Sequence, residues 1–141
     1  PSDGPPWWPF QRWAQRAEPV FPSPLGLLIH PRYGLWHAWR GALLFAEALD
    51  LPGPGTAEHP CESCRERPCL RACPVGAFAP AGYDVEACAG HAGGPEGAAC
   101  RDGGCLARHA CPVGRDFAYG PEQAAFHMAA FLRRRPGGDP A

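Results

Sequence analysis

Eight cysteines are the residues of this sequence best suited to chemistry, and all of them lie between residues 61 and 111. Four fall within "CESCRERPCLRACPVGAF" (61–78), where a proline directly follows the fourth. The cysteines are Cys61, Cys64, Cys69, Cys73, Cys88, Cys100, Cys105 and Cys111. Thiols at this density are typical of disulfide frameworks, structural zinc sites or iron–sulfur clusters.

The cysteines belong to an internal repeat. The segment "CRERPCLRACPVG" (64–76) aligns with "CRDGGCLARHACPVG" (100–114), and the second copy carries two extra residues before its last cysteine. The alignment pairs Cys64 with Cys100, Cys69 with Cys105 and Cys73 with Cys111, and by elimination Cys61 with Cys88. A duplicated set of thiols indicates two sites of the same kind.

The spacing favours two [4Fe-4S] clusters. Residues 61–74 read C-x2-C-x4-C-x3-C-P. This is close to the bacterial run C-x2-C-x2-C-x3-C-P, in which the fourth cysteine binds the other cluster. The crossed assignment places Cys61, Cys64, Cys69 and Cys111 on one cluster, and Cys73, Cys88, Cys100 and Cys105 on the other. An uncrossed assignment, with each four in sequence order, is the alternative, because the second copy is enlarged before Cys111.

Two other chemistries stay open. A disulfide framework suits small secreted chains, but we find no secretion signal and such a framework does not explain the proline after each copy's last cysteine. Structural zinc prefers two CxxC knuckles, whereas only Cys61 and Cys64 have that spacing. A zinc-stapled interaction module is therefore the third function to consider.

Around the cysteines the sequence resembles the two-cluster bacterial ferredoxins. It is closer still to the ferredoxin-like module of epoxyqueuosine reductase and the reductive dehalogenases. The resemblance is carried by "CPVGAF" (73–78), by Asp84 and Cys88 in "GYDVEACAG", and by the cysteine group at 100–112. It covers roughly 58–115 and implies a ferredoxin-like carrier that transfers electrons to a redox protein partner. The sequence departs from that family in two places: four residues instead of two separate Cys64 from Cys69, and the second copy is enlarged.

A second segment, "LGLLIHPRYGLWHAWRGALLF" (25–45), is similar to flavin-reductase-like proteins that process vitamin B12. The matching residues are Ile29, His30, Pro31, Arg32, Tyr33, Gly34, Trp36, Ala38, Arg40 and Gly41. The resemblance implies an alternative function, the electron-delivery portion of a corrinoid-linked reductase or B12-processing protein. Its partner would be an upstream corrinoid-type domain, and cobalamin is expected only with that additional domain. The opening at Pro1, without Met, fits a fragment of a longer protein.

The elements that must position the cysteines are short. Alternating apolar residues on either side of Pro31–Gly34 predict a β-hairpin over 25–45. The other predictions are an amphipathic helix over 7–18, a linker over 51–60, a glycine-rich loop over 91–100, and a helix from Pro121 that ends in Arg133–Arg135. We therefore expect an α+β fold. An N-terminal helix and β-hairpin segment (1–57) precedes a two-cluster ferredoxin-like module with a C-terminal helix (58–141).

Composition narrows the partners. Thirteen basic residues, all arginine, balance fourteen acidic ones, so no overall field favours nucleic acid or an anionic membrane. No apolar run reaches the length of a membrane span. We expect a cytoplasmic protein, because thiols stay reduced there. No residue is assigned a catalytic role, and none of the six histidines is assigned as a ligand. This chain alone is expected to carry electrons and not to catalyse a reaction.

Overall fold

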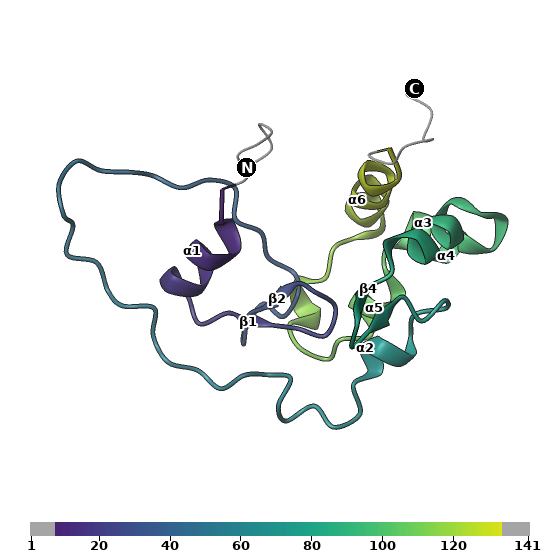
Figure 1. Ribbon diagram of the computed structural model, residues 1–141, viewed down its shortest axis with the longest axis horizontal. Helices are drawn as coiled ribbons and strands as arrows, with labels where there is room; N and C mark the ends of the chain where they lie inside the picture. Colours follow the sequence, from purple (N-terminus) through teal and green to yellow (C-terminus); the bar gives the residue numbers. More distant parts are fainter. Residues whose placement is uncertain (1–7, 134–141) are drawn as a thin grey trace.

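The structure is a computed structural model that describes residues 8–133 of the 141-residue chain. Its helices and two small antiparallel hairpins make it broadly α+β, as predicted. Figure 1 shows an N-terminal segment beside a group of short helices, with a wide loop joining them. Trp7 of the predicted first helix and Arg134–Arg135 of the last lie outside the described residues.

The N-terminal segment forms a helix and a short hairpin. Helix α1 (Phe10–Ala17) buries Ala14 against Val20, so the predicted amphipathic helix is present. Strands β1 (Phe21–Pro22) and β2 (Leu28–Ile29) pair antiparallel, joined by a tight turn. The helix and hairpin together make a small apolar cluster that also includes Leu28, with Trp39 packed on it.

The predicted hairpin over 25–45 is wrong in its strand pairing. Strand β2 pairs with β1, which precedes it, and no strand forms after the turn at 31–34. His30 and Gly34 make one isolated bridge, after which Leu35 and Trp36 are both buried, so the alternation of a two-faced strand is lost. The Leu35 carbonyl accepts hydrogen bonds from Arg108 instead of from a neighbouring strand.

Residues 38–58 form the wide loop of Figure 1 and have no regular structure, which includes most of the predicted linker. All of them except Trp39 are exposed. Large apolar side chains are among them: Leu43, Leu44, Phe45, Leu49 and Leu51. The loop therefore adds little to the core that positions the cysteines.

The cysteine-bearing half is built from short helices and one further hairpin. In chain order the elements are α2 (Pro68–Arg71), β3 (Phe78–Ala79), β4 (Gly82–Tyr83), α3 (Val85–Gly93), the 3-10 turn η1 (Pro95–Gly97), α4 (Ala98–Gly103), α5 (Leu106–His109), the 3-10 turn η2 (Arg115–Phe117) and α6 (Pro121–Arg133). Helix α2 packs on α5, and α4 packs on α6. No helix of the described chain has the length and hydropathy needed to cross a bilayer.

The predicted glycine-rich loop over 91–100 is mostly helical. Helix α3 continues to Gly93, and after one extended residue η1 and α4 follow. Gly97 serves close packing, because a Cβ there would lie 1.9 Å from the His91 carbonyl oxygen. Arg101 donates to the carbonyls of Ala92 and Gly94 and so satisfies the end of α3.

The internal repeat is visible in the backbone. A four-residue helix, α2 in the first copy and α5 in the second, ends two residues before the last cysteine of each copy. Each copy then ends in Cys-Pro-Val-Gly, and the closing glycines Gly76 and Gly114 both adopt left-handed backbone, with φ of 58° and 71°. The same local sequence therefore turns the chain in the same way after Cys73 and after Cys111.

The N-terminal segment and the cysteine-bearing half share one core. Leu25, Ile29 and Leu35 pack with Ala107 and Cys111. The two backbones also touch directly at Gly34 and Gly114. A Cβ on Gly34 would lie 2.0 Å from the Val113 oxygen, so only glycine permits this approach.

Candidate metal centres

Two cavities gather the eight cysteines. The first lies between β2 and the loop before α2, and its cysteines are Cys61, Cys64, Cys69 and Cys111. Prolines surround it at positions 24, 60, 68 and 112, and Ile29 and Val113 add apolar wall. This cavity is small, with a volume of about 20 Å³.

The second cavity lies under α3 and α6, and its cysteines are Cys73, Cys88, Cys100 and Cys105. It is wider, about 310 Å³, and its wall is mostly apolar. Leu25 and Leu27 reach it from the N-terminal segment, and Met128 and Phe131 reach it from α6. Tyr83 and Val75, each about two-fifths exposed, lie at its edge.

The two groups coincide with the crossed sets of the sequence analysis. Cys69, within α2, lines the first cavity, and Cys73, just after α2 ends, lines the second. Cys111 from the second copy joins the first cavity, as the crossed assignment requires. Among the described residues, no three His, Cys, Asp or Glu side chains converge as they would on a single metal ion. All eight thiols are free of disulfides.

Peptide N–H groups point at several of these sulfurs. The Ala77 amide donates to Cys73 Sγ at 3.3 Å, within the turn closed by Gly76. Burial raises the pKa of Cys69 and Cys105, and backbone amides oppose it: that of Leu70 at Cys69, and those of Arg108 and Ala107 at Cys105. Such donors stabilise negative charge on sulfur, whether on a free thiolate or on one bound to metal.

Burial raises the pKa of the Cys61, Cys69 and Cys105 thiols above their ordinary value of 9.0. For Cys61 the neighbouring thiols of Cys111, Cys69 and Cys64 add to this effect, and the charge of Arg67 opposes it. Because a metal binds the thiolate, binding must displace protons that these thiols hold tightly. Metal and proton therefore compete at both cavities.

The donor chemistry fits [4Fe-4S] clusters, since each cavity offers four thiols and a cube takes four thiolates. The second cavity has ample room for such a group. The first, at about 20 Å³, holds little more than one water molecule. A cube there requires the loop 61–68 to move outward. Most of that loop is exposed, so little buried surface opposes the movement.

Three further residues near the cavities were not assigned from the sequence. His91 lines the second cavity, three positions after Cys88 on the same face of α3, a spacing that could have revealed it. Arg67 lines the first cavity. Arg108 lines the second, and its guanidinium lies over the rings of Trp36 and Tyr119 at 4.5 and 4.6 Å.

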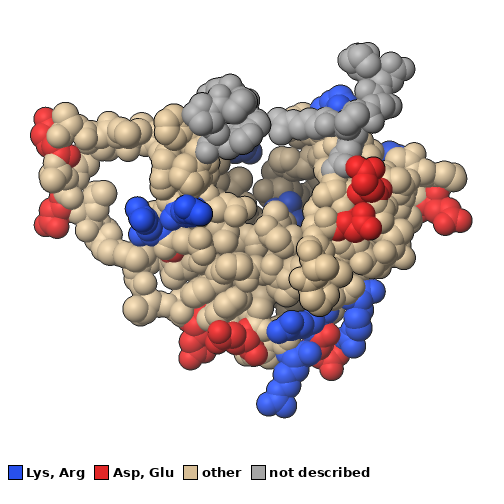
Figure 2. All heavy atoms as spheres, viewed as in Figure 1, with Lys and Arg blue, Asp and Glu red and all other residues tan. Residues whose placement is uncertain are grey.

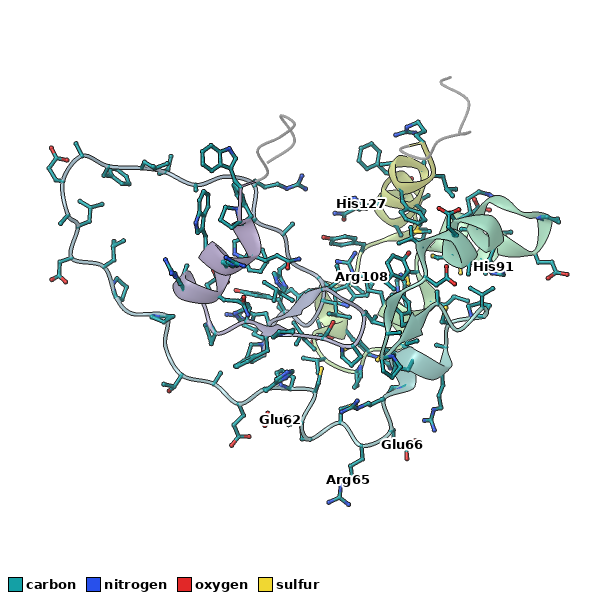
Figure 3. The ribbon with its side chains drawn as sticks, viewed as in Figure 1. Glu62, Arg65, Glu66, His91, Arg108 and His127 are labelled. Atoms are coloured by element: carbon teal, nitrogen blue, oxygen red, sulfur yellow. The ribbon has the colours of Figure 1, made fainter. Side chains whose placement is uncertain are left out.

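Figure 3 places His91 on α3 and Arg108 between the N-terminal segment and the cysteine-bearing half. Figure 2 shows charged side chains of both signs along the lower edge of this face. Figure 3 places Glu62, Arg65 and Glu66 at that edge, on the loop that closes the first cavity. Glu66 pairs with Arg71 at 2.7 Å, an exposed pair that contributes little to stability.

Comparisons with known proteins add nothing to this geometry. No family model, curated protein or solved structure matches this chain.

Proposed function

We propose that this protein is an electron carrier that binds two [4Fe-4S] clusters through its eight cysteines. The observation that carries the proposal is the division of the thiols into two groups of four, each around its own cavity. The Cys-Pro ending and left-handed glycine of each copy add to it. When bound, each cluster would accept and release one electron, which is the chemistry this class of cofactor supplies.

The chain's own residues hold and insulate the redox groups. Thiolates anchor each cluster, peptide N–H groups direct positive ends of their dipoles at sulfur, and apolar side chains exclude water from the wider cavity. The prolines around the first cavity have no backbone N–H to donate, and they cannot continue a helix. The proposal places the protein in a reducing compartment such as the cytoplasm, where thiols remain available for metal.

The first test is metal and sulfide content after anaerobic purification. We expect about eight irons and about eight acid-labile sulfides per chain, four of each per cluster. Zinc without sulfide would overturn the proposal in favour of a zinc-stapled interaction module. Neither metal nor sulfide, with intact thiols, would overturn both.

Paired substitutions then test the ligand sets. The variant Cys61→Ala/Cys111→Ala removes two ligands of one crossed set, so we expect it to keep about four irons. The variant Cys61→Ala/Cys73→Ala removes one ligand from each crossed set, so we expect almost none. With uncrossed sets the two results would be exchanged, and each variant therefore controls for the other's loss of stability.

A second candidate function has one observation in its favour. Residues 25–45 resemble B12-processing proteins, and Leu25, Ile29 and Leu35 of this segment pack into the same core as Ala107 and Cys111. This arrangement fits the electron-delivery portion of a corrinoid-linked reductase. Because cobalamin is expected only with the upstream domain, the test is whether the reduced, iron-loaded chain reduces a corrinoid bound to a separate corrinoid-binding protein, followed by visible absorbance. Reduction of the bound corrinoid would favour this candidate, and reduction of redox-protein acceptors alone would favour the carrier.

A further inference from the structure

Residues 42–51, within the wide loop, expose a continuous run of large apolar side chains. The run reads "ALLFAEALDL", and we call it the apolar segment. Every residue of it is exposed, up to 84% at Leu43 and 90% at Leu44. Soluble proteins rarely leave so much contiguous apolar surface in water unless another surface covers it. The apolar segment is therefore a candidate for an interaction surface.

The composition of the apolar segment favours a helix, although it has no regular structure in this chain. Eight of its ten residues are alanine, leucine or glutamate, which are strong helix formers, and Pro52 follows it as a stop signal. A helix this short is marginal in water and needs a surface to pack against. Helical spacing would place Asp50 opposite the apolar face and Glu47 at its border. The residues of that apolar face are Leu44, Phe45, Ala48, Leu49 and Leu51.

The charge of the region limits what can cover the apolar segment. Residues 41–64 contain no lysine or arginine, whereas the whole chain has nearly equal numbers of basic and acidic residues. The acidic residues of this stretch are Glu47, Asp50, Glu58 and Glu62. An anionic membrane would repel such a stretch. A protein surface that is both apolar and basic fits it best.

Helix α1 presents a surface of that kind. Arg12 and Arg16 are exposed and lie one turn apart on the same face of α1, and no acidic side chain of the described chain pairs with either. Trp13 lies beside them, with its ring 6.0 Å from that of Trp8 and 5.2 Å from that of Phe10. Trp8 is 62% exposed. Figure 2 shows basic side chains over α1 and acidic ones on the wide loop.

The apolar segment does not contact α1 of its own chain, although both ends of the loop lie there. Trp39 packs on the apolar cluster that includes Ala14, and residues 54–57 line a hollow with Gln15 and Glu18. Between these ends the loop extends away from α1 (Figure 1). A segment that projects outward in this way is placed to reach α1 of another molecule.

We propose that the apolar segment of one copy folds as a helix against α1 of a second copy, so that the chain forms a symmetric dimer. With a twofold axis between the copies, each segment meets the other's α1 and the two contacts form together. In each contact Glu47 and Asp50 lie near Arg12 and Arg16. This inference goes beyond the proposed electron transfer and does not require either cluster.

The test is analytical ultracentrifugation of the anaerobically purified protein over a wide range of concentrations. One variant, Glu47→Arg/Asp50→Arg, makes the apolar segment basic, and another, Arg12→Glu/Arg16→Glu, makes α1 acidic. Each variant alone brings like charges together in both contacts, so we expect dimerisation to weaken about tenfold or more. An equimolar mixture of the two should restore the dimer, because each contact then joins opposite charges.

Glu58→Arg/Glu62→Arg is the matched control, because it changes the net charge equally on the same loop outside the apolar segment. It should dimerise almost as wild type does. Helical circular dichroism of wild type should increase as the dimer forms. A variant with all four reversals in one chain should also dimerise, which shows that the reversed residues do not prevent folding.

Three results would overturn the proposal. The first is a wild type that is monomeric at every concentration, as it would be if the segment packed on its own α1 or on a different protein. The second is a dimer that both reversal variants retain. The third is failure of both the mixture and the fourfold variant to restore the dimer. Iron and sulfide content is measured separately, so the proposed function can fail without affecting this result, and the reverse.

Discussion

At the scale of single residues, the structure assigns different tasks to residues of the same type. Cys69 and Cys73 are four positions apart, yet they line different cavities because α2 ends between them. Three arginines of the repeated segments also differ in their neighbours. Arg67 lines the first cavity, Arg101 donates to a carbonyl at the end of α3, and Arg108 lies over aromatic rings. Residue type gives the chemistry available at a position, and the local backbone decides where it is used.

His37 gives a prediction about acid sensitivity. Burial lowers the pKa of His37 from 6.5, and the neighbouring His30 lowers it further. The folded chain then binds fewer protons than the unfolded one, so this contribution to stability is present above pH 6.5 and is lost as pH falls through the folded-state pKa. We expect the N-terminal segment to become more open to proteolysis between about pH 7 and pH 5, and His37→Gln to weaken that dependence.

The measurement is limited proteolysis across this pH range, with a protease active throughout it. Absorbance of the proposed clusters should be followed in the same samples, because acid also protonates thiolates and would release bound metal. If His37→Gln shows the wild-type pH profile while the absorbance is unchanged, His37 is not the group responsible.

At the scale of elements, two contacts add to the shared apolar core in fastening the N-terminal segment to the cysteine-bearing half. One is the backbone contact of Gly34 with Val113 and Gly114. The other is Arg108, which donates to the Leu35 carbonyl between the rings of Trp36 and Tyr119. The loop 38–58 joins the same parts covalently, and all of it except Trp39 is exposed.

Substitution at Gly34 should be costly. Gly34→Ala adds a Cβ at positive φ that meets the Val113 oxygen, so we expect a loss of about 2 kcal/mol or more, from backbone strain and steric overlap. Gly41→Ala is the control, because a Cβ at that position would have no neighbouring heavy atom within 4 Å. Chemical denaturation of the iron-loaded proteins, followed by circular dichroism, measures both. Equal stability of the two variants would contradict the contact.

Arg108 should be the second fastening point. Arg108→Gln removes the charged donor to Leu35 and the stacking on two rings, and we expect a loss of about 2 kcal/mol. Cleavage within residues 38–58 should then release the N-terminal segment, whereas cleaved wild type should keep it bound. Size-exclusion chromatography after limited proteolysis distinguishes these outcomes. Release from wild type as well would show that these contacts are too weak to hold the segment.

Local signals predicted some elements well and others poorly. Pro121, the following acid and the final arginine predicted α6 because each is a local helix signal. The 91–100 segment was predicted as a loop from its glycines, but alanines on either side sustain helix, and Gly97 is required for packing against His91. Strand β2 pairs with β1, and the Leu35 carbonyl accepts from Arg108, 73 positions away, a contact that no local pattern contains.

At the scale of the whole molecule, the core is small and contains many thiols. In the described residues Ile29 is the most completely buried large side chain, and few others are buried: Val20, Leu25, Leu28, Leu35 and Trp36. Five cysteines pack in or against the same cluster: Cys61, Cys69, Cys73, Cys105 and Cys111. So little buried apolar surface gives a weak driving force for folding.

We therefore expect metal to contribute much of the stability. Anaerobic removal of iron with a chelator should reduce the helical circular dichroism signal, because ligand binding and folding are coupled in small metal-binding domains. Reconstitution with iron and sulfide should restore it. A metal-free chain that keeps a near-native spectrum would contradict this expectation.

The division of the cysteines between two cavities could be predicted from the repeat, since spacing and duplication are present in the sequence. The unequal volumes of the two cavities could not. They depend on which distant side chains reach each one: Met128 and Phe131 border the wide cavity, whereas prolines close the narrow one.

The exchange of one cysteine between the copies has a consequence for biosynthesis. A ribosome makes the chain from its N-terminus, so Cys73, Cys88, Cys100 and Cys105 have all been added before Cys111. With the ligand sets crossed as proposed, the wide cavity has its full complement first. The narrow one waits for Cys111, and the Leu35 contact with Arg108 forms in the same late interval. In a nascent chain, iron would therefore be bound first at the wide cavity and later at the narrow one, although the narrow cavity contains the earliest cysteine, Cys61.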